Sequence, residues 1–145
     1  MTIKQLSVFV SRIALFVIYI WFGVLKVIGQ SPASPLVRDL CLKTLPFIPP
    51  ANFIVLFGLF EIAIGILFII PRWEKLAFIL FAVHMFTTVL PLFLLGAVWT
   101  HPFVPTLEGQ YIIKNLALIA CALTIAGSLT PKENAPIPQR TIDEF

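Results

Sequence analysis

The side chains that could do chemistry are few in this sequence, and they lie inside long apolar runs. The run "FGLFEIAIGILFII" (57–70) carries a single charged residue, Glu61. An unpaired charge in hydrocarbon is unfavourable, so ionisable residues within membrane spans are typical of ligand sites and proton relays. Such residues occur in each of the four apolar runs, with hydroxyl groups near them. The predicted ligand-binding set is Lys26, Glu61, His84, Thr88, Tyr111 and Lys114.

This set allows hydrogen bonding to an anionic or carbonyl-bearing ligand, together with proton exchange. Lys26 or Lys114 would hydrogen-bond a ligand oxygen, and Glu61 or His84 would exchange its proton. The two cysteines and two histidines of the chain are widely separated and include no CxxC pair, which argues against a metal knuckle or a dithiol relay. We therefore expect no metal site and no covalent cofactor, and no catalytic residue can be assigned.

Four apolar runs must position these groups. They cover residues 6–28, 53–70, 76–98 and 111–129, and each has about the 17–25 residues that a helix needs to cross a bilayer. The chain is 59% hydrophobic and 12% charged, whereas a soluble domain carries about 25% charged residues. These features predict an all-α fold in one domain (1–129), a four-helix transmembrane bundle, followed by a polar, disordered tail (130–145).

Helical periodicity predicts one polar stripe on each span. At 100° per residue, Glu61 shares a face with Gly58 and Gly65, and small residues let a neighbouring helix approach closely. Span one places Arg12, Tyr19, Gly23 and Lys26 on one face, span three places His84, Thr87, Thr88 and Pro91 together, and span four aligns Tyr111, Lys114, Leu118 and Cys121. Four such stripes favour a polar centre, in which the threonine hydroxyls would compensate for the N–H that Pro91 lacks.

Simpler interpretations of the same residues stay open. Lys26 and Lys114 would reach the headgroups if their long side chains snorkel, or one of them would form a structural ion pair with Glu61. His84 would serve helix packing, and Arg12 would anchor one end of span one. In these cases the stripes stabilise the bundle without binding a ligand.

The connecting segments predict an interfacial helix and an orientation. In "SPASPLVRDLCLKTLP" (31–46), the apolar residues share one face, which indicates a short amphipathic helix lying at the membrane surface between spans one and two. Lysine and arginine are commoner on the flanks that include both termini, so both termini are expected in the cytoplasm. The inner flanks carry Lys4, Arg72, Lys75, Lys132 and Arg140, and the outer loops carry Arg38 and Lys43. The alternative that the first run is a cleaved signal peptide is disfavoured by its length and by Arg12 and Lys26.

The order of these motifs resembles the DoxX-like family of small bacterial four-span membrane proteins. The similarity lies in "WFGVLKVIGQSPASPLV" (21–37), "GLFEIAIGIL" (58–67), "HMFTTVLPLF" (84–93) and "LEGQYIIKNLALIA" (107–120). The resemblance implies a four-helix bundle in the cytoplasmic membrane, with characteristic polar positions at Lys26, Glu61, Thr88 and Lys114. It also implies a link to redox chemistry, because some relatives are membrane subunits of a thiosulfate:quinone oxidoreductase and others associate with oxidative-stress enzymes.

Three functions follow as expectations. The first is a membrane subunit of a redox system that binds a quinone or similar lipid-soluble ligand in the outer half of the bundle, with a soluble or membrane partner protein supplying the electrons. The second is a scaffold for a partner enzyme, and the third is a small proton-coupled transporter that would need to form a homo-oligomer. Whether the chain is itself part of an enzyme is left open. The net charge of +3 is scattered, which excludes nucleic acid as a partner.

Overall fold

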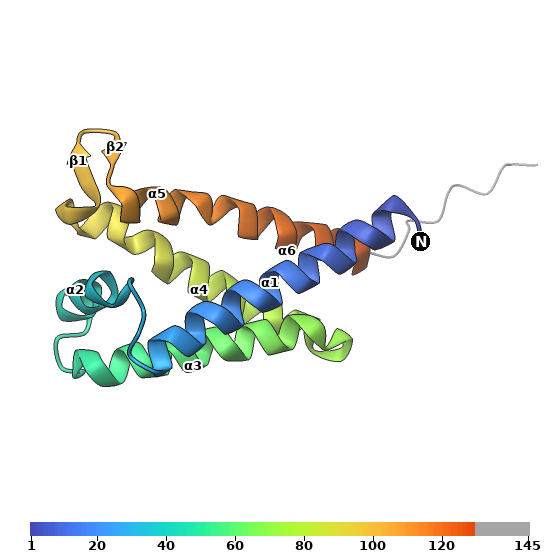
Figure 1. Ribbon diagram of the computed structural model, residues 1–145, viewed down its shortest axis with the longest axis horizontal. Helices are drawn as coiled ribbons and strands as arrows, with labels where there is room; N and C mark the ends of the chain where they lie inside the picture. Colours follow the sequence, from blue (N-terminus) through green and yellow to red (C-terminus); the bar gives the residue numbers. More distant parts are fainter. Residues whose placement is uncertain (130–145) are drawn as a thin grey trace, which may run out of the picture.

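The computed structural model describes residues 1–129, which form a bundle of long helices (Figure 1). Within these residues four helical spans are long and apolar enough to cross a membrane, so the chain is a multi-pass membrane protein with the predicted all-α architecture. The predicted tail (130–145) lies outside the described residues. The helices are α1 (Ile3–Val27), α2 (Ser34–Thr44), α3 (Pro50–Ile69), α4 (Glu74–Leu94), α5 (Leu107–Lys114) and α6 (Leu116–Leu129), with 3-10 helices η1 (Pro71–Trp73) and η2 (Gly96–Val98) and strands β1 (Trp99–His101) and β2 (Val104–Pro105).

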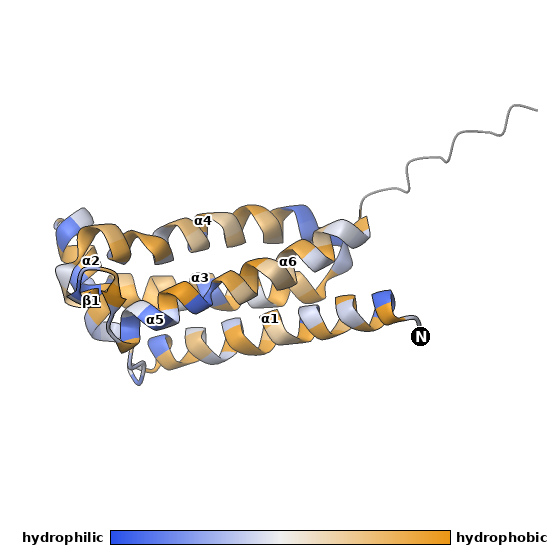
Figure 2. Cartoon of the chain, turned by 90° about the horizontal axis from the view of Figure 1, so that it is seen from above, coloured by the Kyte–Doolittle hydropathy of each residue, from blue (hydrophilic) through white to orange (hydrophobic). Residues whose placement is uncertain are grey.

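The bundle has two distinct ends. The N-terminus and the short η1 turn between α3 and α4 lie at one end, which we call the N-terminal end, and α2 and the β1–β2 hairpin lie at the other, the α2 end (Figure 1). Apolar residues colour most of the helix surfaces between the two ends (Figure 2). Large apolar side chains such as Phe86 (69% exposed) and Ile79 (60% exposed) point outwards, as lipid-facing residues do.

Helix α2 confirms the predicted interfacial helix. Its buried residues are Val37 and Cys41, four positions apart on one face, and the helix packs against α3 and α4. Lys43 donates to the carbonyl oxygen of Leu94 at the C-terminus of α4. Because the last carbonyls of a helix have no partner within it, this contact joins α2 to the end of α4.

The third and fourth spans differ from the predicted runs. Span three was expected to reach Val98, but α4 ends at Leu94 and the chain turns through η2 into the hairpin, with Trp99 Nε1 donating to the Leu92 carbonyl oxygen at 2.9 Å. The fourth span begins at Leu107, not at Tyr111, and is interrupted at Asn115. The interruption divides its contacts, since α5 packs against α4 and α6 packs against α1.

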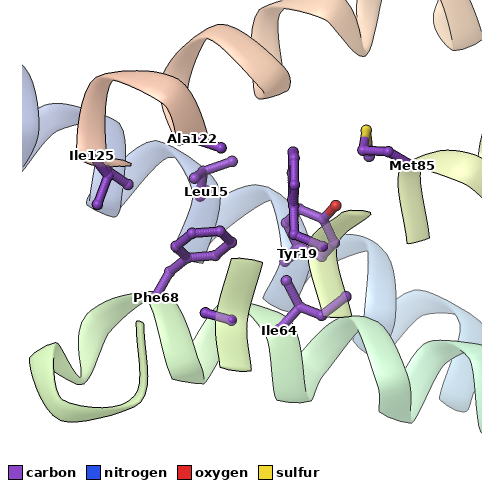
Figure 3. Close-up of a cluster of buried hydrophobic side chains, with 9 residues drawn as sticks. Leu15, Tyr19, Ile64, Phe68, Met85, Ala122 and Ile125 are labelled. Atoms are coloured by element: carbon purple, nitrogen blue, oxygen red, sulfur yellow. The ribbon is translucent and has the colours of Figure 1, made fainter. Parts of the chain in front are cut away.

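The apolar core fills the part of the bundle nearer the N-terminal end. Leu15 and Tyr19 of α1, Ile64 and Phe68 of α3, and Ile125 of α6 are at most 2% exposed and point towards one another (Figure 3). Phe68 meets Phe78 and Phe81 of α4 edge to face, with ring centroids 5.5 and 5.7 Å apart, a favoured geometry for aromatic pairs. This core holds α1, α3, α4 and α6 together, and the buried residues Lys26, Glu61 and His84 lie on its α2 side.

Candidate functional site

A pair of opposite charges is buried between α1 and α3. Lys26 Nζ donates to both carboxylate oxygens of Glu61, at 2.9 Å to Oε1 and 2.7 Å to Oε2, and each residue is 5% exposed. The Cα–Cβ bonds of a helix lean towards its N-terminus. Because α1 and α3 run in opposite directions (Figure 1), the two side chains lean towards each other. Glu61 therefore faces the interior of the bundle.

Two glycines set the distance between these helices. A Cβ atom at Gly23 would lie 2.6 Å from the carbonyl oxygen of Gly58, and one at Gly58 would lie 2.7 Å from the carbonyl oxygen of Gly23. A methyl group does not fit at either position, so the two backbones touch here. A Cβ at Gly58 would also lie 2.9 Å from the Cβ of Lys26. Lys26 is thereby held one helical turn from Glu61, within reach of its carboxylate.

His84 of α4 and Tyr19 of α1 extend the ion pair into a chain of hydrogen bonds. His84 Nε2 lies 3.1 Å from Glu61 Oε1, and His84 Nδ1 lies 3.0 Å from the Tyr19 hydroxyl. A neutral imidazole satisfies both contacts when Nε2–H donates to the carboxylate and Nδ1 accepts the phenolic proton. We call Lys26, Glu61, His84 and Tyr19 the polar cluster. It joins α1, α3 and α4, and its members are 2–6% exposed.

Thr88 lies at the half-buried edge of the polar cluster. Its hydroxyl donates to the His84 carbonyl oxygen at 2.8 Å and lies 3.4 Å from His84 Nδ1. Thr87 donates to the same carbonyl oxygen, also at 2.8 Å. The expectation that these hydroxyls compensate for the N–H missing at Pro91 is therefore wrong, because both bond one turn earlier in α4. The two hydroxyl groups instead add hydrogen bonds to the backbone at His84.

Aromatic rings form the apolar wall of the polar cluster. Phe57 stacks on the His84 imidazole, with centroids 5.1 Å apart and planes 20° apart, and its centroid lies 5.8 Å from Lys26 Nζ. Phe60 is inclined to the same imidazole at 6.2 Å. Phe57 is only partly buried, so it separates the ion pair and the imidazole from the surroundings of the bundle. A flat ring entering from this side would meet an aromatic face and an ammonium group together.

The structure does not bring Tyr111 and Lys114 into the polar cluster. Both are exposed, and Lys114 Nζ lies over the Tyr111 ring, 4.9 Å from its centroid. Side chains on α5 lean towards its N-terminus, which lies at the α2 end, so Lys114 points along the span towards that end. This is the arrangement expected of a lysine that snorkels to the membrane surface beside an interfacial tyrosine.

A second ion pair lies towards the N-terminal end, away from the polar cluster. Arg12 of α1 pairs with Glu74 at the start of α4 and donates to the Phe68 carbonyl oxygen of α3 at 2.8 Å. The two side chains are 17% and 13% exposed. Arg12 therefore does more than anchor one end of span one, because it links α1 to α3 and to the start of α4.

The set of site residues predicted from the sequence lacks one member of the polar cluster. It omitted Tyr19, although this residue shares the face of α1 that carries Lys26 and Gly23. The choice of candidates favoured ionisable groups, and tyrosine is common at membrane interfaces. Its depth could have identified it, because Tyr19 lies seven residues before Lys26. This places it about 10 Å farther from the C-terminal end of the span, too deep for an interfacial tyrosine.

The polar cluster is electrically balanced and internally satisfied. One ammonium and one carboxylate leave no net charge, and within residues 1–129 every buried side-chain nitrogen and oxygen has a hydrogen-bond partner. The same residues contain no group of three or more His, Cys, Asp or Glu side chains placed to hold a metal ion. The arrangement suits hydrogen bonding and proton transfer to a neutral ligand better than it suits binding of an anion.

No protein-family model, curated protein or solved structure matches this chain. The resemblance to the DoxX-like family accordingly stays a prediction, and function has to be argued from the site.

Proposed function

We propose that this membrane protein binds a quinone or a similar neutral, lipid-soluble carbonyl ligand at the polar cluster and exchanges protons with it, as a subunit of a redox system. The observation that carries the proposal is the continuous hydrogen-bonded chain from Tyr19 through His84 and Glu61 to Lys26, next to the partly buried ring of Phe57. A quinone has a flat ring and carbonyl oxygens, which match the aromatic wall and the ammonium donor.

The protonation chemistry follows from the contacts of His84. Each ring nitrogen bonds an oxygen, so the imidazole can accept a proton on one side and release one on the other. Lys26 would donate a hydrogen bond to a ligand carbonyl, and Glu61 and His84 would relay to the ligand protons that are taken up from water. Reduction of a quinone to a quinol takes two electrons and two protons. The electrons would come from a partner oxidoreductase, and this chain would contribute only the proton path.

A ligand would reach the polar cluster by displacing Phe57. Lys26, Glu61 and His84 are at most 6% exposed, whereas Phe57 is partly exposed and contacts both Lys26 and His84. Rotation of one phenyl ring would open the ammonium and the imidazole to a ligand that arrives through the lipid. We place this site in the outer half of a bundle in the cytoplasmic membrane, with both termini in the cytoplasm, because of the distribution of lysine and arginine.

Quinone binding to the purified protein tests the proposal. The protein is extracted from its native membrane with a mild detergent, its bound quinones are quantified, and the affinity for a short-chain ubiquinone analogue is measured. We expect Lys26→Met and Tyr19→Phe to weaken binding about tenfold or more, which corresponds to loss of one charge-assisted hydrogen bond or of a positioned partner. Lys114→Met and Tyr111→Phe are matched controls, since they make the same chemical changes outside the polar cluster.

The opposite pattern would favour a scaffold for a partner enzyme. The specific observation behind this second candidate is that the polar cluster is already satisfied within residues 1–129, as polar groups that only join helices are. If no quinone binds, and if a partner protein co-purifies equally well with the Tyr19→Phe variant and with the unaltered protein, the polar cluster is packing and the quinone proposal is wrong.

A further inference from the structure

An open groove of about 420 Å³ lies between α1 and α6 at the N-terminal end. Its floor and walls come from the first three turns of α1 and the last turn of α6. The innermost lining residue, Arg12, is seven residues before Tyr19, about 10 Å along α1, and the groove shares no residue with the polar cluster. The residues that line it are Lys4, Gln5, Val8, Phe9, Arg12 and Ser128.

The lining combines cationic donors with an apolar wall. Lys4 is exposed, and Arg12 is partly buried at the inner side of the groove. Arg12 uses Nη1 for the Phe68 carbonyl and Nη2 for Glu74, two contacts for a group with five N–H donors. The Arg12–Glu74 pair is neutral, so Lys4 leaves the groove with one positive charge. Val8 and Phe9 supply the apolar part, and Phe9 is 58% exposed.

We propose that this groove binds an anionic phospholipid, with Lys4 and Arg12 at its phosphate and Phe9 and Val8 along the upper part of an acyl chain. The groove lies where a membrane-spanning helix begins, which is the depth of the headgroups. Guanidinium and ammonium groups are the usual protein ligands of phosphate, and basic residues at this depth attract anionic lipids. A free phosphate ion would use the cations but would gain nothing from the aromatic wall.

Lipid retention by the purified full-length protein tests this inference. The protein is delipidated in a neutral detergent and titrated with phosphatidylglycerol or phosphatidylethanolamine, and binding is followed by native mass spectrometry. We expect a preference for phosphatidylglycerol that falls about fivefold in Lys4→Gln, the effect of one basic residue near a membrane surface. Lys75→Gln is the matched control, because Lys75 is also an exposed lysine at the N-terminal end but does not line the groove. Arg12 is left unaltered, since it also joins α1 to α3 and α4.

Phe9→Ala tests the apolar wall. It should narrow the difference in affinity between phosphatidylglycerol with long acyl chains and the same lipid with eight-carbon chains, because less of the chain is then covered. The inference is wrong if Lys75→Gln lowers binding as much as Lys4→Gln, which would indicate diffuse attraction to a basic surface. It is also wrong if inorganic phosphate displaces the lipid at equal concentration, which would indicate a phosphate site. Quinone binding should be unaltered in Lys4→Gln, so the two proposals can fail separately.

Discussion

Breaking the ion pair between Lys26 and Glu61 should have unequal effects that depend on which partner is removed. Removal of one member of a buried pair leaves the other charge uncompensated, which typically destabilises a protein by about 3–5 kcal/mol. The two residues differ in how easily the remaining charge can reach water. Lys26 lies one residue before the end of α1, whereas Glu61 lies eleven residues after the start of α3 and eight before its end.

These positions give the expected magnitudes. After Glu61→Gln, the lysine side chain is long enough to turn towards the headgroups at the α2 end, so we expect a loss of only about 1–2 kcal/mol, close to that of one buried hydrogen-bonded group. After Lys26→Gln, the carboxylate stays about 12–16 Å from either end of its helix, and the full loss of about 3–5 kcal/mol applies. The double variant should be more stable than Lys26→Gln alone, because two amides can bond each other.

The free energy of unfolding in mixed micelles, followed by tryptophan fluorescence, measures these differences. Glu74→Gln is the control, since it alters a carboxylate that is also paired, but with Arg12 in a more exposed place, and we expect a smaller loss there than for Lys26→Gln. Equal losses for Lys26→Gln and Glu61→Gln, or a double variant no more stable than Lys26→Gln, would contradict the reasoning. Either result would mean that Lys26 is not what stabilises the buried carboxylate of Glu61.

Three further predictions concern the packing and orientation of the bundle. Gly58→Ala should destabilise the protein by about 1–3 kcal/mol, because the added methyl group meets the α1 backbone. In the control Gly127→Ala the methyl group would meet nothing within 4 Å, so this change should be neutral or stabilise α6 by up to about 1 kcal/mol. Thermal unfolding in detergent compares the two variants. Lys114→Met should change the free energy of unfolding by less than about 0.5 kcal/mol, and a larger loss would show that Lys114 has a structural partner. A cysteine at position 103, which is 95% exposed as Phe103, should react with a membrane-impermeant maleimide added outside intact cells, and protection there would reverse the orientation inferred from the basic residues.

Helical periodicity was enough to bring four of the six predicted site residues together, three inside the polar cluster and Thr88 at its edge. Lys26, Glu61 and His84 all carry charge or a titratable ring within apolar runs, and a polar side chain in a span turns inwards because hydrocarbon offers it no partner. The glycine pattern around Glu61 added the second signal, since glycines on one helix face let a neighbouring helix approach closely. Gly58 does lie against α1, at Gly23.

Span four could not be placed by the same reasoning. The predicted stripe assumed one continuous helix from Tyr111 to Leu129, but the interruption at Asn115 separates α5 from α6, and periodicity does not extend across such a break. Apolar residues occur on every face of this span, so hydrophobicity does not distinguish its lipid-facing side from the side that faces the bundle interior. Lys114 was therefore free to lie outwards over Tyr111, an outcome that its spacing alone does not reveal.

The outward position of Lys114 changes the kind of ligand that the site favours. Two lysines facing one glutamate would have left a positive charge in the bundle and would have favoured an anion. With Lys26 alone the charges balance, and an anion entering the polar cluster would carry an uncompensated charge into a nearly dry interior. A neutral ligand with carbonyl oxygens brings no such charge, and it can accept from Lys26 while His84 and Tyr19 keep their hydrogen bond. The charge balance at Glu61 therefore favours a neutral carbonyl ligand over the anionic one that the sequence left open.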